Sequence, residues 1–283
     1  MIALGSGLLP AGRQRRGAAP MILDAIAIYP VKGLRGIAVQ EAVVEPWGLQ
    51  GDRRWMVVDA AGRYLTQRDL PGMARIAAVP DAGGITLSVD GVDPLHVPVP
   101  NDPAEVRVWR DRVQAQEAGP DAAAWLSQVL GHPCRLVHMG DPAAARGVDP
   151  AYAKPEDRVS FADGFPVLVV NAASLDDLNA CMVQPVPMDR FRTNLVVSGA
   201  PAWAEDGWAS LQVGPVPLRG PKTCARCVVI TTDQATGARP RDREPLRTLT
   251  ALRRDAAGRV TFGMNLIPDG TGRIAVGMDV RLG

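Results

Sequence analysis

Short runs of β-forming residues, each closed by a turn signal, restrict the fold of this sequence more than any other feature. Residues 21–29 form an apolar run that ends at Pro30, and residues 60–62 (Ala-Ala-Gly) have the character of a hairpin turn. Turn signals recur about every eight to twelve residues along much of the chain, a spacing typical of β-sandwiches and β-barrels. The 29 glycines and 25 prolines also favour tight turns over long helices. We therefore expect a mixed α+β protein that is rich in strands and has few helices.

Three segments have helical character. Residues 120–130 are rich in alanine and leucine, start with a proline and precede Gly131, an arrangement typical of a helix with a C-terminal glycine stop. A second helix is expected to begin at Ser174, with this serine as its N-cap and acidic residues in its first turn. In residues 245–252, three leucines have the spacing that places them on one helical face.

The chain divides most naturally near its middle. Residues 140–160 are polar and irregular, so we place a boundary there and expect two β-rich domains, 21–140 and 141–283. Within residues 1–20 an apolar stretch precedes three arginines, which reverses the order found in a secretory signal. We expect these residues to be a disordered extension or a misassigned start.

Charge and motif content exclude several classes of function. The chain has 31 basic and 30 acidic residues, and the net charge of +1 gives no overall field that would attract nucleic acid or a membrane. No apolar run approaches the roughly 18 residues of a membrane-spanning helix. Four cysteines are too few for a disulfide framework in a chain of 283 residues, which favours a reducing compartment. Hydrolase and nucleotide-binding motifs such as HExxH, a P-loop or GxGxxG are missing from the sequence.

Cys224 and Cys227 form the position with the greatest chemical potential in the sequence. Lys222 and Arg226 place positive charge beside them, which favours the reactive thiolate over the thiol. Residues 228–232 are β-formers, so we expect the cysteine loop to lead into a strand. The residues alone leave four interpretations open: part of a zinc site, a redox pair, two buried unreactive thiols, or a single cysteine ligand to a metal that a cofactor carries. The expected strand counts against a thioredoxin-like pair, and the lack of a second ligand pair in the sequence counts against zinc.

Cationic side chains also stand next to turns or strands at several separate places. They are Lys32 with Arg35, Arg53 with Arg54, Arg192, and Arg226. Each alone is compatible with an ordinary solvated charge. Arginine, however, binds phosphate through two parallel hydrogen bonds, and glycine-rich turns present backbone N–H groups to anions. If the fold brings these cations together, they could hold a phosphorylated cofactor.

Several motifs, in the same order along the chain, resemble the MOSC family. The strings YPVKG, GLQGDRRW and LTQR, which begin at residues 29, 48 and 65, resemble its N-terminal β-barrel domain. The strings FRTNLVVSG, EDGW, CARC, TTD, TG and FGMN, between residues 191 and 265, resemble the MOSC domain itself. The resemblance is strongest to the branch that contains the mitochondrial amidoxime-reducing component and its bacterial counterparts. It implies a MOSC β-barrel domain packed against a β-rich N-terminal domain.

The resemblance also implies a cofactor and a site. In that family a pyranopterin molybdenum cofactor (Mo-molybdopterin) lies between the two lobes, and a protein cysteine binds the metal; pyridoxal phosphate is not expected. By matching motifs, Cys227 is the implied molybdenum ligand and catalytic residue, with Cys224 a neighbour and not a ligand. The other implied cofactor-binding residues are Lys32, Gly33, Arg53, Asp163, Gly164, Phe165, Arg192, Asn194, Ala225, Arg226 and Asn265.

The implied activity is reduction of N-hydroxylated compounds, namely amidoximes, hydroxylamines and N-hydroxylated bases, with the oxygen leaving as water. The sequence stops at Gly283 and has no four-cysteine cluster pattern, so electrons are expected from a separate ferredoxin-, flavodoxin- or cytochrome-type protein. The N-terminal extension has no membrane-anchor segment, which favours a cytoplasmic enzyme. The alternative function is a sulfur-carrier or cofactor-carrier module in which Cys227 bears a persulfide.

Overall fold

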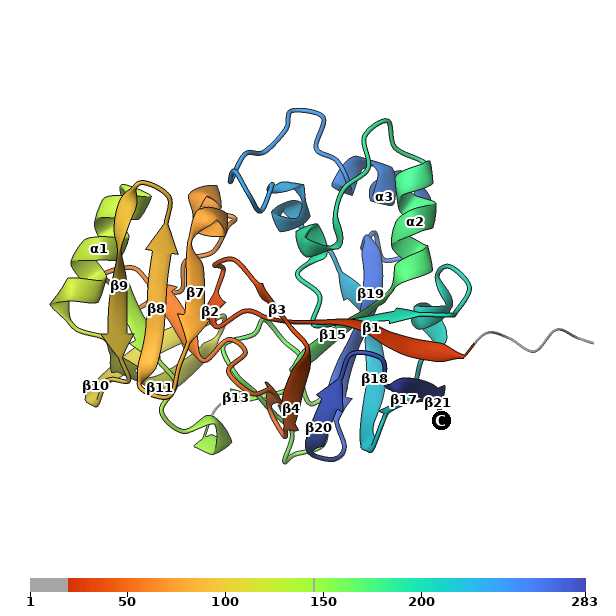
Figure 1. Cartoon of the computed structure of the whole chain (residues 1–283), viewed down its shortest axis with the longest axis horizontal. Helices are drawn as coiled ribbons and strands as arrows, with labels where there is room; N and C mark the ends of the chain where they lie inside the picture. The colour runs from red at the N-terminus through yellow and green to blue at the C-terminus, as the bar shows by residue number, and fades with distance from the viewer. Residues whose placement is uncertain (1–19, 145) are drawn as a thin grey trace, which may run out of the picture.

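Two β-rich lobes lie side by side in the computed structural model, which describes residues 20–144 and 146–283 (Figure 1). The extension expected at residues 1–20 falls outside the described residues except for Pro20. Strands make up most of the regular structure, which confirms the expected β-rich α+β class. The α-helices of the described residues are α1 (Pro120–Leu130), α2 (Ala172–Ala180) and α3 (Leu246–Arg253).

A closed barrel forms the lobe that contains most of the second half of the chain. Its strand order is β16-β15-β19-β18-β17-β21-β1, and β1 pairs with β16 to close it. Strands β15 and β16 run parallel, whereas β1 and β16 run antiparallel. The barrel strands are β1 (Met21–Ile28), β15 (Val167–Asn171), β16 (Leu195–Ser198), β17 (Ser210–Val213), β18 (Val216–Ala225), β19 (Thr261–Pro268) and β21 (Asp279–Leu282).

Side chains from all sides fill the interior of this barrel, as the small diameter of a seven-stranded closed sheet requires. Leu23, Val169, Leu195, Leu211 and Met264 belong to one buried cluster there. All five residues of β15 are buried because α2 covers the outer face of this strand. Strand β1 is the first described element, and it pairs with strands from the far end of the chain. The domain boundary near residue 140 stays a prediction.

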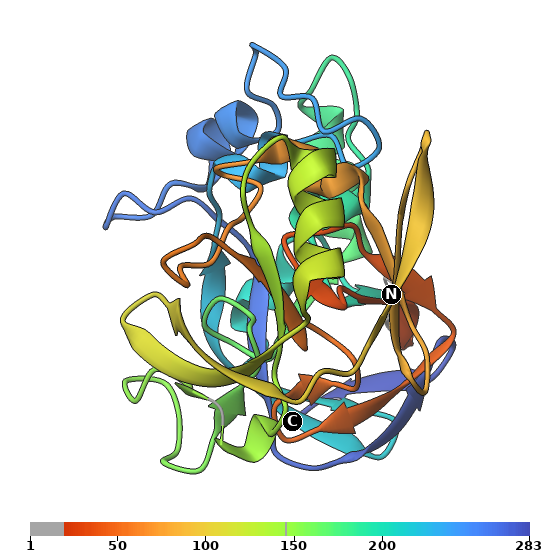
Figure 2. The same ribbon diagram turned by 90° about the vertical axis from the view of Figure 1, so that its left-hand side faces the viewer.

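The other lobe contains a five-stranded sheet and a three-stranded sheet. Helix α1 packs against β12 and β9, and Figure 2 shows it from the side of this lobe. The five-stranded sheet has the order β10 (Asp102–Val108), β11 (Asp111–Glu117), β12 (Arg135–His138), β6 (Trp55–Val58) and β2 (Val31–Lys32). The three-stranded sheet consists of β7 (Ala77–Pro80), β8 (Gly84–Val89) and β9 (Val92–Pro98).

Smaller elements complete the described structure. Strand β3 (Ile37–Val39) extends the barrel sheet beside β1. A three-stranded sheet contains β20 (Gly272–Ala275), β4 (Glu41–Glu45) and β5 (Gly48–Leu49), and β13 (Arg146–Gly147) pairs with β14 (Arg158–Val159). The 3₁₀-helices are η1 (Pro71–Arg75), η2 (Pro142–Ala144), η3 (Met188–Phe191), η4 (Ala204–Gly207) and η5 (Val228–Thr231).

The helix at residues 120–130 is confirmed with the expected bounds, but the cap predicted for the second helix is wrong. Asn171 caps α2, because its side chain accepts a hydrogen bond of 3.3 Å from the Ala173 backbone N–H. Ser174 lies inside the helix, and its hydroxyl instead donates to the Glu205 carboxylate over 2.6 Å. No acidic residue stands in the first turn of α2.

The strand predicted after the cysteine loop is also wrong. Residues 228–231 form the 3₁₀-helix η5, and the preceding residues up to Ala225 form the long strand β18. Strand pairing ends there because the partner strand β19 begins at Thr261, which lies opposite Ala225. Beyond that point, local hydrogen bonds replace the ladder: the Ile230 N–H donates to the Cys227 carbonyl over 3.2 Å. Cys224 is the second-last residue of β18 and Cys227 directly precedes η5, so no strand directly follows the pair and a redox pair is not excluded on that ground.

Candidate functional site

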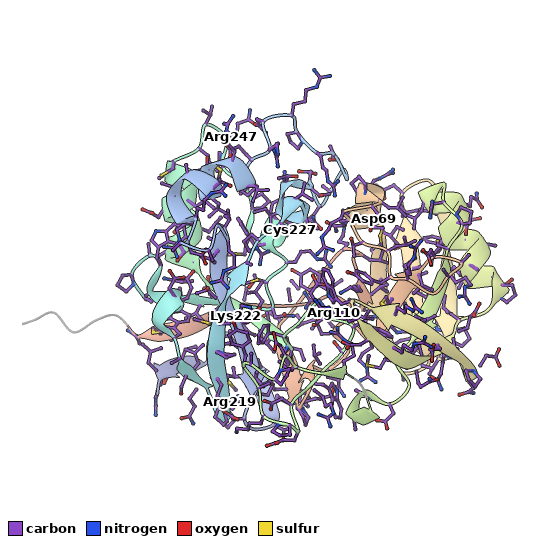
Figure 3. The ribbon with its side chains drawn as sticks, turned by 180° about the vertical axis from the view of Figure 1, so that it is seen from behind. Asp69, Arg110, Arg219, Lys222, Cys227 and Arg247 are labelled. Atoms are coloured by element: carbon purple, nitrogen blue, oxygen red, sulfur yellow. The ribbon has the colours of Figure 1, made fainter. Side chains whose placement is uncertain are left out.

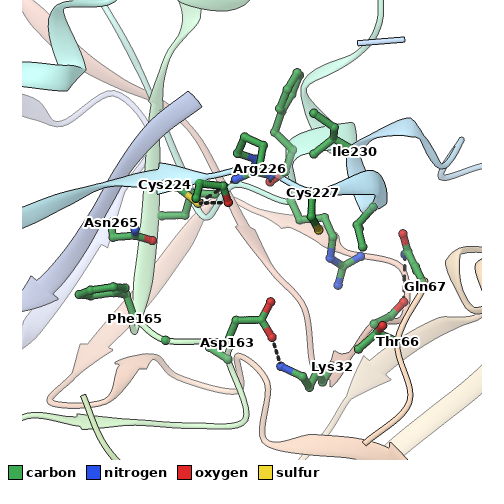
Figure 4. Close-up of a pocket in the computed structure, with 18 of the residues that line it drawn as sticks. Lys32, Thr66, Gln67, Asp163, Phe165, Cys224, Arg226, Cys227, Ile230 and Asn265 are labelled. Carbon is green, nitrogen blue, oxygen red and sulfur yellow. Dashed lines mark hydrogen bonds and ion pairs between the residues drawn. The ribbon is translucent and has the colours of Figure 1, made fainter. Parts of the chain in front are cut away.

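One pocket collects all twelve residues that the sequence predicted for the site, from Lys32 to Asn265. Both lobes contribute to its lining: Lys32 comes from β2, and Cys227 stands between β18 and η5 (Figure 4). The sequence did not indicate a site role for several other lining residues, including Thr66, Gln67, Arg68, Phe191 and Ile230. Three of these belong to the LTQR string, so that motif was the signal that could have found them.

The two cysteines lie on the barrel side of the pocket, across from Lys32 and Asp163 (Figure 4). Both thiols are free and partly exposed. The backbone N–H of Arg226 donates to the Val260 carbonyl over 2.7 Å, which anchors the segment between the cysteines. The Arg226 guanidinium donates to the Cys224 sulfur over 3.0 Å and to the Phe191 carbonyl over 2.5 Å. Arg226 thus contacts Cys224, and not Cys227, through its side chain.

Arg68 is the cation associated with Cys227. Partial burial disfavours its charge, but hydrogen bonding and charge attraction from Cys227, with help from Asp163, raise the pKa of Arg68 above its ordinary value. Its guanidinium also lies 3.6 Å from the Asp163 carboxylate and 5.2 Å from the centre of the Trp109 ring. Arg68 thus places a positive charge beside Cys227.

Lys32 and Asp163 form an ion pair on the other side of the pocket. The Lys32 ammonium is buried, and it also donates to the Phe161 carbonyl over 2.8 Å. Burial lowers the pKa of Lys32, while Asp163 opposes that effect. Desolvation acts to raise the pKa of Asp163, but Lys32, Arg68 and Arg53 outweigh it and lower the pKa to about 2. Because the Asp163 side chain is 58% exposed, we attribute this low value mainly to the surrounding cations.

Arg53 is held in place by a buried carboxylate. Its guanidinium donates to Asp52 over 2.5 Å, to the Asn194 side-chain oxygen over 3.0 Å and to the Arg192 carbonyl over 3.3 Å. Burial raises the pKa of Asp52, and the Arg53 charge opposes this shift. The backbone of Arg53 has a φ of +48°, a left-handed conformation that bulky residues rarely adopt. The Arg53 N–H donates to the Tyr29 carbonyl over 2.8 Å, and this hydrogen bond helps to fix the turn.

Arg192 meets Arg53 at the ring of Tyr29. Each guanidinium carbon lies 4.3 Å from the ring centre, so one aromatic ring contacts two cations. Burial lowers the pKa of Arg192 to about 10, with Tyr29 acting in the opposite direction. Arg192 also has a left-handed backbone, with a φ of +54°, and donates to the Leu34 carbonyl over 2.7 Å.

Gly33 occupies a turn that excludes a side chain. Its φ is +86°, and a Cβ atom there would lie 2.8 Å from the Met73 methyl group. The Gly33 carbonyl accepts a hydrogen bond of 2.9 Å from the Gln67 side-chain amide. This turn therefore places backbone, and not a side chain, next to Lys32 at the edge of the pocket.

The two asparagines predicted for the site differ in how far they are already engaged. The Asn194 side chain accepts from Arg53 and from the Leu168 N–H, and it donates to the Ala27 carbonyl, so it mainly positions Arg53. Asn265 makes one long contact of 3.4 Å to the Thr223 carbonyl and has most of its hydrogen-bonding capacity free for a ligand.

The described residues contain no group of three or more histidine, cysteine or acidic side chains that could hold a metal ion without help. Cys134 is buried and Cys181 is exposed, and neither of them lines the pocket. The zinc interpretation of the cysteine pair therefore has no ligand set in the described part of the chain. In that same part, no helix has the length and apolar character needed to cross a membrane.

Comparison with known proteins gives two family matches. The model of the MOSC N-terminal beta barrel domain matches residues 21–133, and the model of the MOSC domain matches residues 156–281. Mitochondrial amidoxime-reducing component 1 of Mus musculus is 34% identical over 267 residues, which cover 89% of this chain and 78% of the mouse protein. The Homo sapiens protein of the same name is 33% identical over 274 residues, or 90% of this chain and 81% of its own.

A second kind of relative matches over a smaller share of its length. Molybdenum cofactor sulfurase of Danio rerio is 32% identical over 271 residues, which cover 86% of this chain but 31% of the sulfurase. Among solved structures, the YUAD protein of Bacillus subtilis aligns over 92% of this chain and 93% of its own, with 10% identity and a TM-score of 0.40. The family assignment consequently rests on the sequence comparisons and not on the structural one.

Proposed function

The chain belongs to the MOSC family, with a MOSC N-terminal beta barrel domain and a MOSC domain, and from this premise we propose that it is a molybdenum-cofactor-dependent reductase of N-hydroxylated compounds. The observation that carries the proposal is the meeting of all twelve predicted residues in one pocket between the lobes. The names of its mouse and human relatives, which are amidoxime-reducing components, support the substrate class.

The pocket fits an anionic cofactor that carries a metal. Its lining includes five cationic side chains and one carboxylate, that of Asp163, among the described residues. Cys227 offers a sulfur ligand of the soft type that molybdenum and other thiophilic metals accept, and Arg68 places a positive charge beside it. Because Arg53 and Arg192 are fixed by buried partners before any ligand binds, they lose little freedom when they bind a phosphate.

Each group of residues has a distinct task in this proposal. Cys227 binds the metal, while Lys32, Arg53 and Arg192 hold the phosphate beside the Gly33 backbone. Ala225 and Arg226 complete the wall next to the metal ligand. The hydrogen-bond donors and acceptors of a pterin ring would contact the part of the pocket lined by Asp163, Gly164, Phe165, Asn194 and Asn265. When bound, the cofactor supplies the two-electron exchange at molybdenum.

The overall reaction is R–NHOH + 2 e⁻ + 2 H⁺ → R–NH₂ + H₂O, in which the N–O bond breaks and the oxygen leaves as water. We propose that a ferredoxin-, flavodoxin- or cytochrome-type protein delivers the two electrons. The word "component" in the names of the mouse and human relatives supports a system of more than one protein. A cytoplasmic location stays a prediction.

The test is the metal content of the protein purified from a host that makes the molybdenum cofactor, beside a Cys227→Ala control. For the wild type we expect nearly one molybdenum per chain and a fluorescent pterin after oxidation. We also expect the wild type, but not the Cys227→Ala variant, to reduce benzamidoxime. A well-folded wild-type protein without molybdenum or pterin, from a host that loads a control enzyme, would overturn the proposal.

The second candidate is a sulfur carrier, which the sulfurase relative favours because its name describes handling of sulfur for the same cofactor. In this function the Cys227 sulfur would attack the outer sulfur of a persulfide donor, so that the S–S bond of the donor breaks, the donor leaves as a thiolate and Cys227 holds the sulfur as a persulfide. Mass spectrometry after incubation with a persulfide donor would detect one added sulfur on Cys227. A carrier has no need of Arg53, Arg192 and Lys32 in one pocket, so the reductase explains more of the site.

A further inference from the structure

A second pocket adjoins the cysteine segment at Ala225 and Arg226 and is dominated by arginine. Its lining includes five arginines and one acidic residue, Asp242, among the described residues. We call these five arginines the arginine face: Arg226, Arg243, Arg247, Arg254 and Arg259. Helix α3, the loop before it and the turn after it carry four of the five, and none of these four belongs to the cofactor site proposed above.

This face concentrates positive charge in a chain that is nearly neutral. Residues 239–259 contain seven arginines and three acidic residues, whereas the whole chain has 31 basic and 30 acidic residues. The remainder of the chain therefore has an acidic excess. A local field of this kind attracts negatively charged partners to one side of the molecule.

Intramolecular ion pairs leave much of this charge available. Arg247 pairs with Glu244 at 2.6 Å and Arg259 pairs with Asp255 at 2.7 Å, but the two arginine side chains are 65% and 49% exposed. Because the arginine side of each pair faces solvent, these arginines can also contact a partner. Arg243 and Arg254 are exposed and have no carboxylate within ion-pair distance in the described part of the chain.

The arginine face is one residue away from the proposed metal ligand. Ala225 and Arg226 line both pockets, and Cys227 follows directly in the sequence. The Arg226 N–H is hydrogen-bonded over 2.7 Å to the carbonyl of Val260, which itself lines the second pocket. Figure 3 shows Arg247 at the periphery of the barrel lobe and Cys227 between the lobes. A short path of covalent bonds and one hydrogen bond thus connects the second pocket to the thiol.

We propose that the arginine face is the docking surface for an acidic electron-donor protein. This inference rests on the proposed reductase function, which requires electrons to arrive at the metal next to Cys227. Four of the five arginines are exposed and come from three successive segments, an arrangement that suits the charged rim of a protein interface. A site for one small anion would instead have buried, converging donors like those of the first pocket.

The test uses the loaded protein and two variants with reversed charge. Arg243→Glu with Arg247→Glu reverses two exposed charges of the face, and Arg281→Glu on β21 is the matched control because this arginine is 77% exposed and makes only a distant ion pair of 3.8 Å. The donor probe is an acidic flavodoxin in its hydroquinone form. Its Kd is measured at low and high ionic strength, and turnover of benzamidoxime is measured with the flavodoxin and with dithionite-reduced methyl viologen.

The double variant should weaken flavodoxin binding about tenfold or more at low salt, and the difference from wild type should shrink at high salt. Flavodoxin-driven turnover should fall in parallel, while viologen-driven turnover stays at the wild-type level because a small cation needs no docking surface. The Arg281→Glu control should match the wild type in every measurement. A neutral pair, Arg243→Gln with Arg247→Gln, should lie between the wild type and the reversed variant.

Three outcomes would overturn the inference. The first is equal flavodoxin affinity in the double variant and the wild type, and the second is an equal loss in Arg281→Glu. The third is that the double substitution abolishes binding of inorganic phosphate but not of flavodoxin, which would make the pocket a small-anion site. Absence of viologen-driven turnover in the loaded wild type would instead defeat the reductase function itself, so the two failures are distinguishable.

Discussion

Gln67 and Gln234 exchange two side-chain hydrogen bonds of 3.0 Å, one in each direction, although 167 residues separate them in the sequence. Both amides are buried. The pair also reaches the site from both lobes: Gln67 donates to the Gly33 carbonyl over 2.9 Å, and the Gln234 oxygen accepts from Arg192 over 3.3 Å. This amide pair therefore couples the Gly33 turn to Arg192, one of the two arginines that we propose bind phosphate.

Gln67→Ala should lower the free energy of unfolding by about 1–3 kcal/mol, because it leaves the Gln234 amide buried without its partner. The same change should weaken retention of the cofactor, since Gly33 loses its hydrogen bond from Gln67 and the Gln234 side chain that accepts from Arg192 loses the partner that fixes it. Chemical denaturation and molybdenum content after dialysis measure the two effects. Gln212→Ala, at an exposed position of β17, is the control and should change neither quantity. Equal results for the two variants would show that the pair has no positioning role.

Ser174 has a different role from the cap predicted for it. Its hydroxyl donates to Glu205 over 2.6 Å and accepts from the Trp203 N–H over 2.7 Å. The side chains of Ser174 and Glu205 are both fully buried. Ser174→Ala should therefore cost about 1–3 kcal/mol of unfolding free energy, because it leaves the buried Glu205 carboxylate and the Trp203 N–H without this partner. Ser198→Ala, at a partly exposed position of β16, serves as the comparison in denaturant titrations and should cost much less.

Glu205→Gln should reveal the cost of this buried carboxyl group as a dependence on pH. Burial raises the pKa of Glu205 above its ordinary value of 4.5. The unfolded chain thus loses this proton at a lower pH than the folded protein does, and wild-type stability falls as the pH rises above about 4.5 towards the folded pKa. Glutamine cannot ionise, so the variant should gain stability relative to wild type over that interval. Denaturation at several pH values measures the difference, and a difference independent of pH would contradict this account.

Local signals predicted some elements completely and others not at all. Helix α1 has a proline in its first turn and Gly131 in a left-handed conformation at its end, so its bounds were readable from neighbouring residues alone. The β-branched residues of η5 favour a strand by propensity, but a strand needs a partner, and β19 begins opposite Ala225. No residue near Val228 contains that information. Residues 37–45 divide into β3 and β4 for a related reason, because the two parts pair with different partners.

The candidate site also has residues that the sequence indicated and residues that it did not. Motif resemblance located Cys227, Lys32, Arg53 and Arg192, and the structure places all of them in one pocket. It did not indicate which residues hold these side chains in place. Asp52 stands beside Arg53 in the sequence and could have been found from that position, whereas the partnership of Gln67 with Gln234 depends on how the lobes meet.

Asp163→Asn should reduce stability at neutral pH and lose this effect in acid. The neighbouring cations lower the pKa of Asp163 from its ordinary value of 3.8 to about 2. A carboxylate with a depressed folded pKa stabilises the folded state above its unfolded pKa, and this contribution disappears as the pH falls from about 4 to about 2. Unfolding free energies of wild type and variant should converge over that range, as followed by denaturation. A gap that persists at pH 2 would mean that the substitution acts through packing and not through charge.

Cys224→Ser should separate the two cysteines of the motif. Only Cys227 is associated with Arg68, whereas Cys224 accepts a hydrogen bond from Arg226 over 3.0 Å. Serine can accept the same hydrogen bond, so Cys224→Ser should keep molybdenum and most of the turnover. Cys227→Ser should keep the fold but lose both, as measured by metal analysis, circular dichroism and benzamidoxime reduction. Loss of molybdenum in both variants would mean that the cysteines act as a pair.

Substitutions of Tyr29 test whether its ring prepares Arg53 and Arg192 for an anion. The ring contacts both guanidinium groups at 4.3 Å, and its hydroxyl donates to the Thr193 carbonyl over 3.2 Å. Tyr29→Leu removes two cation–π contacts of about 0.5–1 kcal/mol each, so the affinity of the cofactor-free protein for pyrophosphate should fall about tenfold. Tyr29→Phe keeps the ring and loses only the hydroxyl contact, so its affinity should stay close to that of wild type. Calorimetric titration with pyrophosphate distinguishes the two variants. If phenylalanine weakened binding as much as leucine does, the hydroxyl and not the ring would be what orders the arginines.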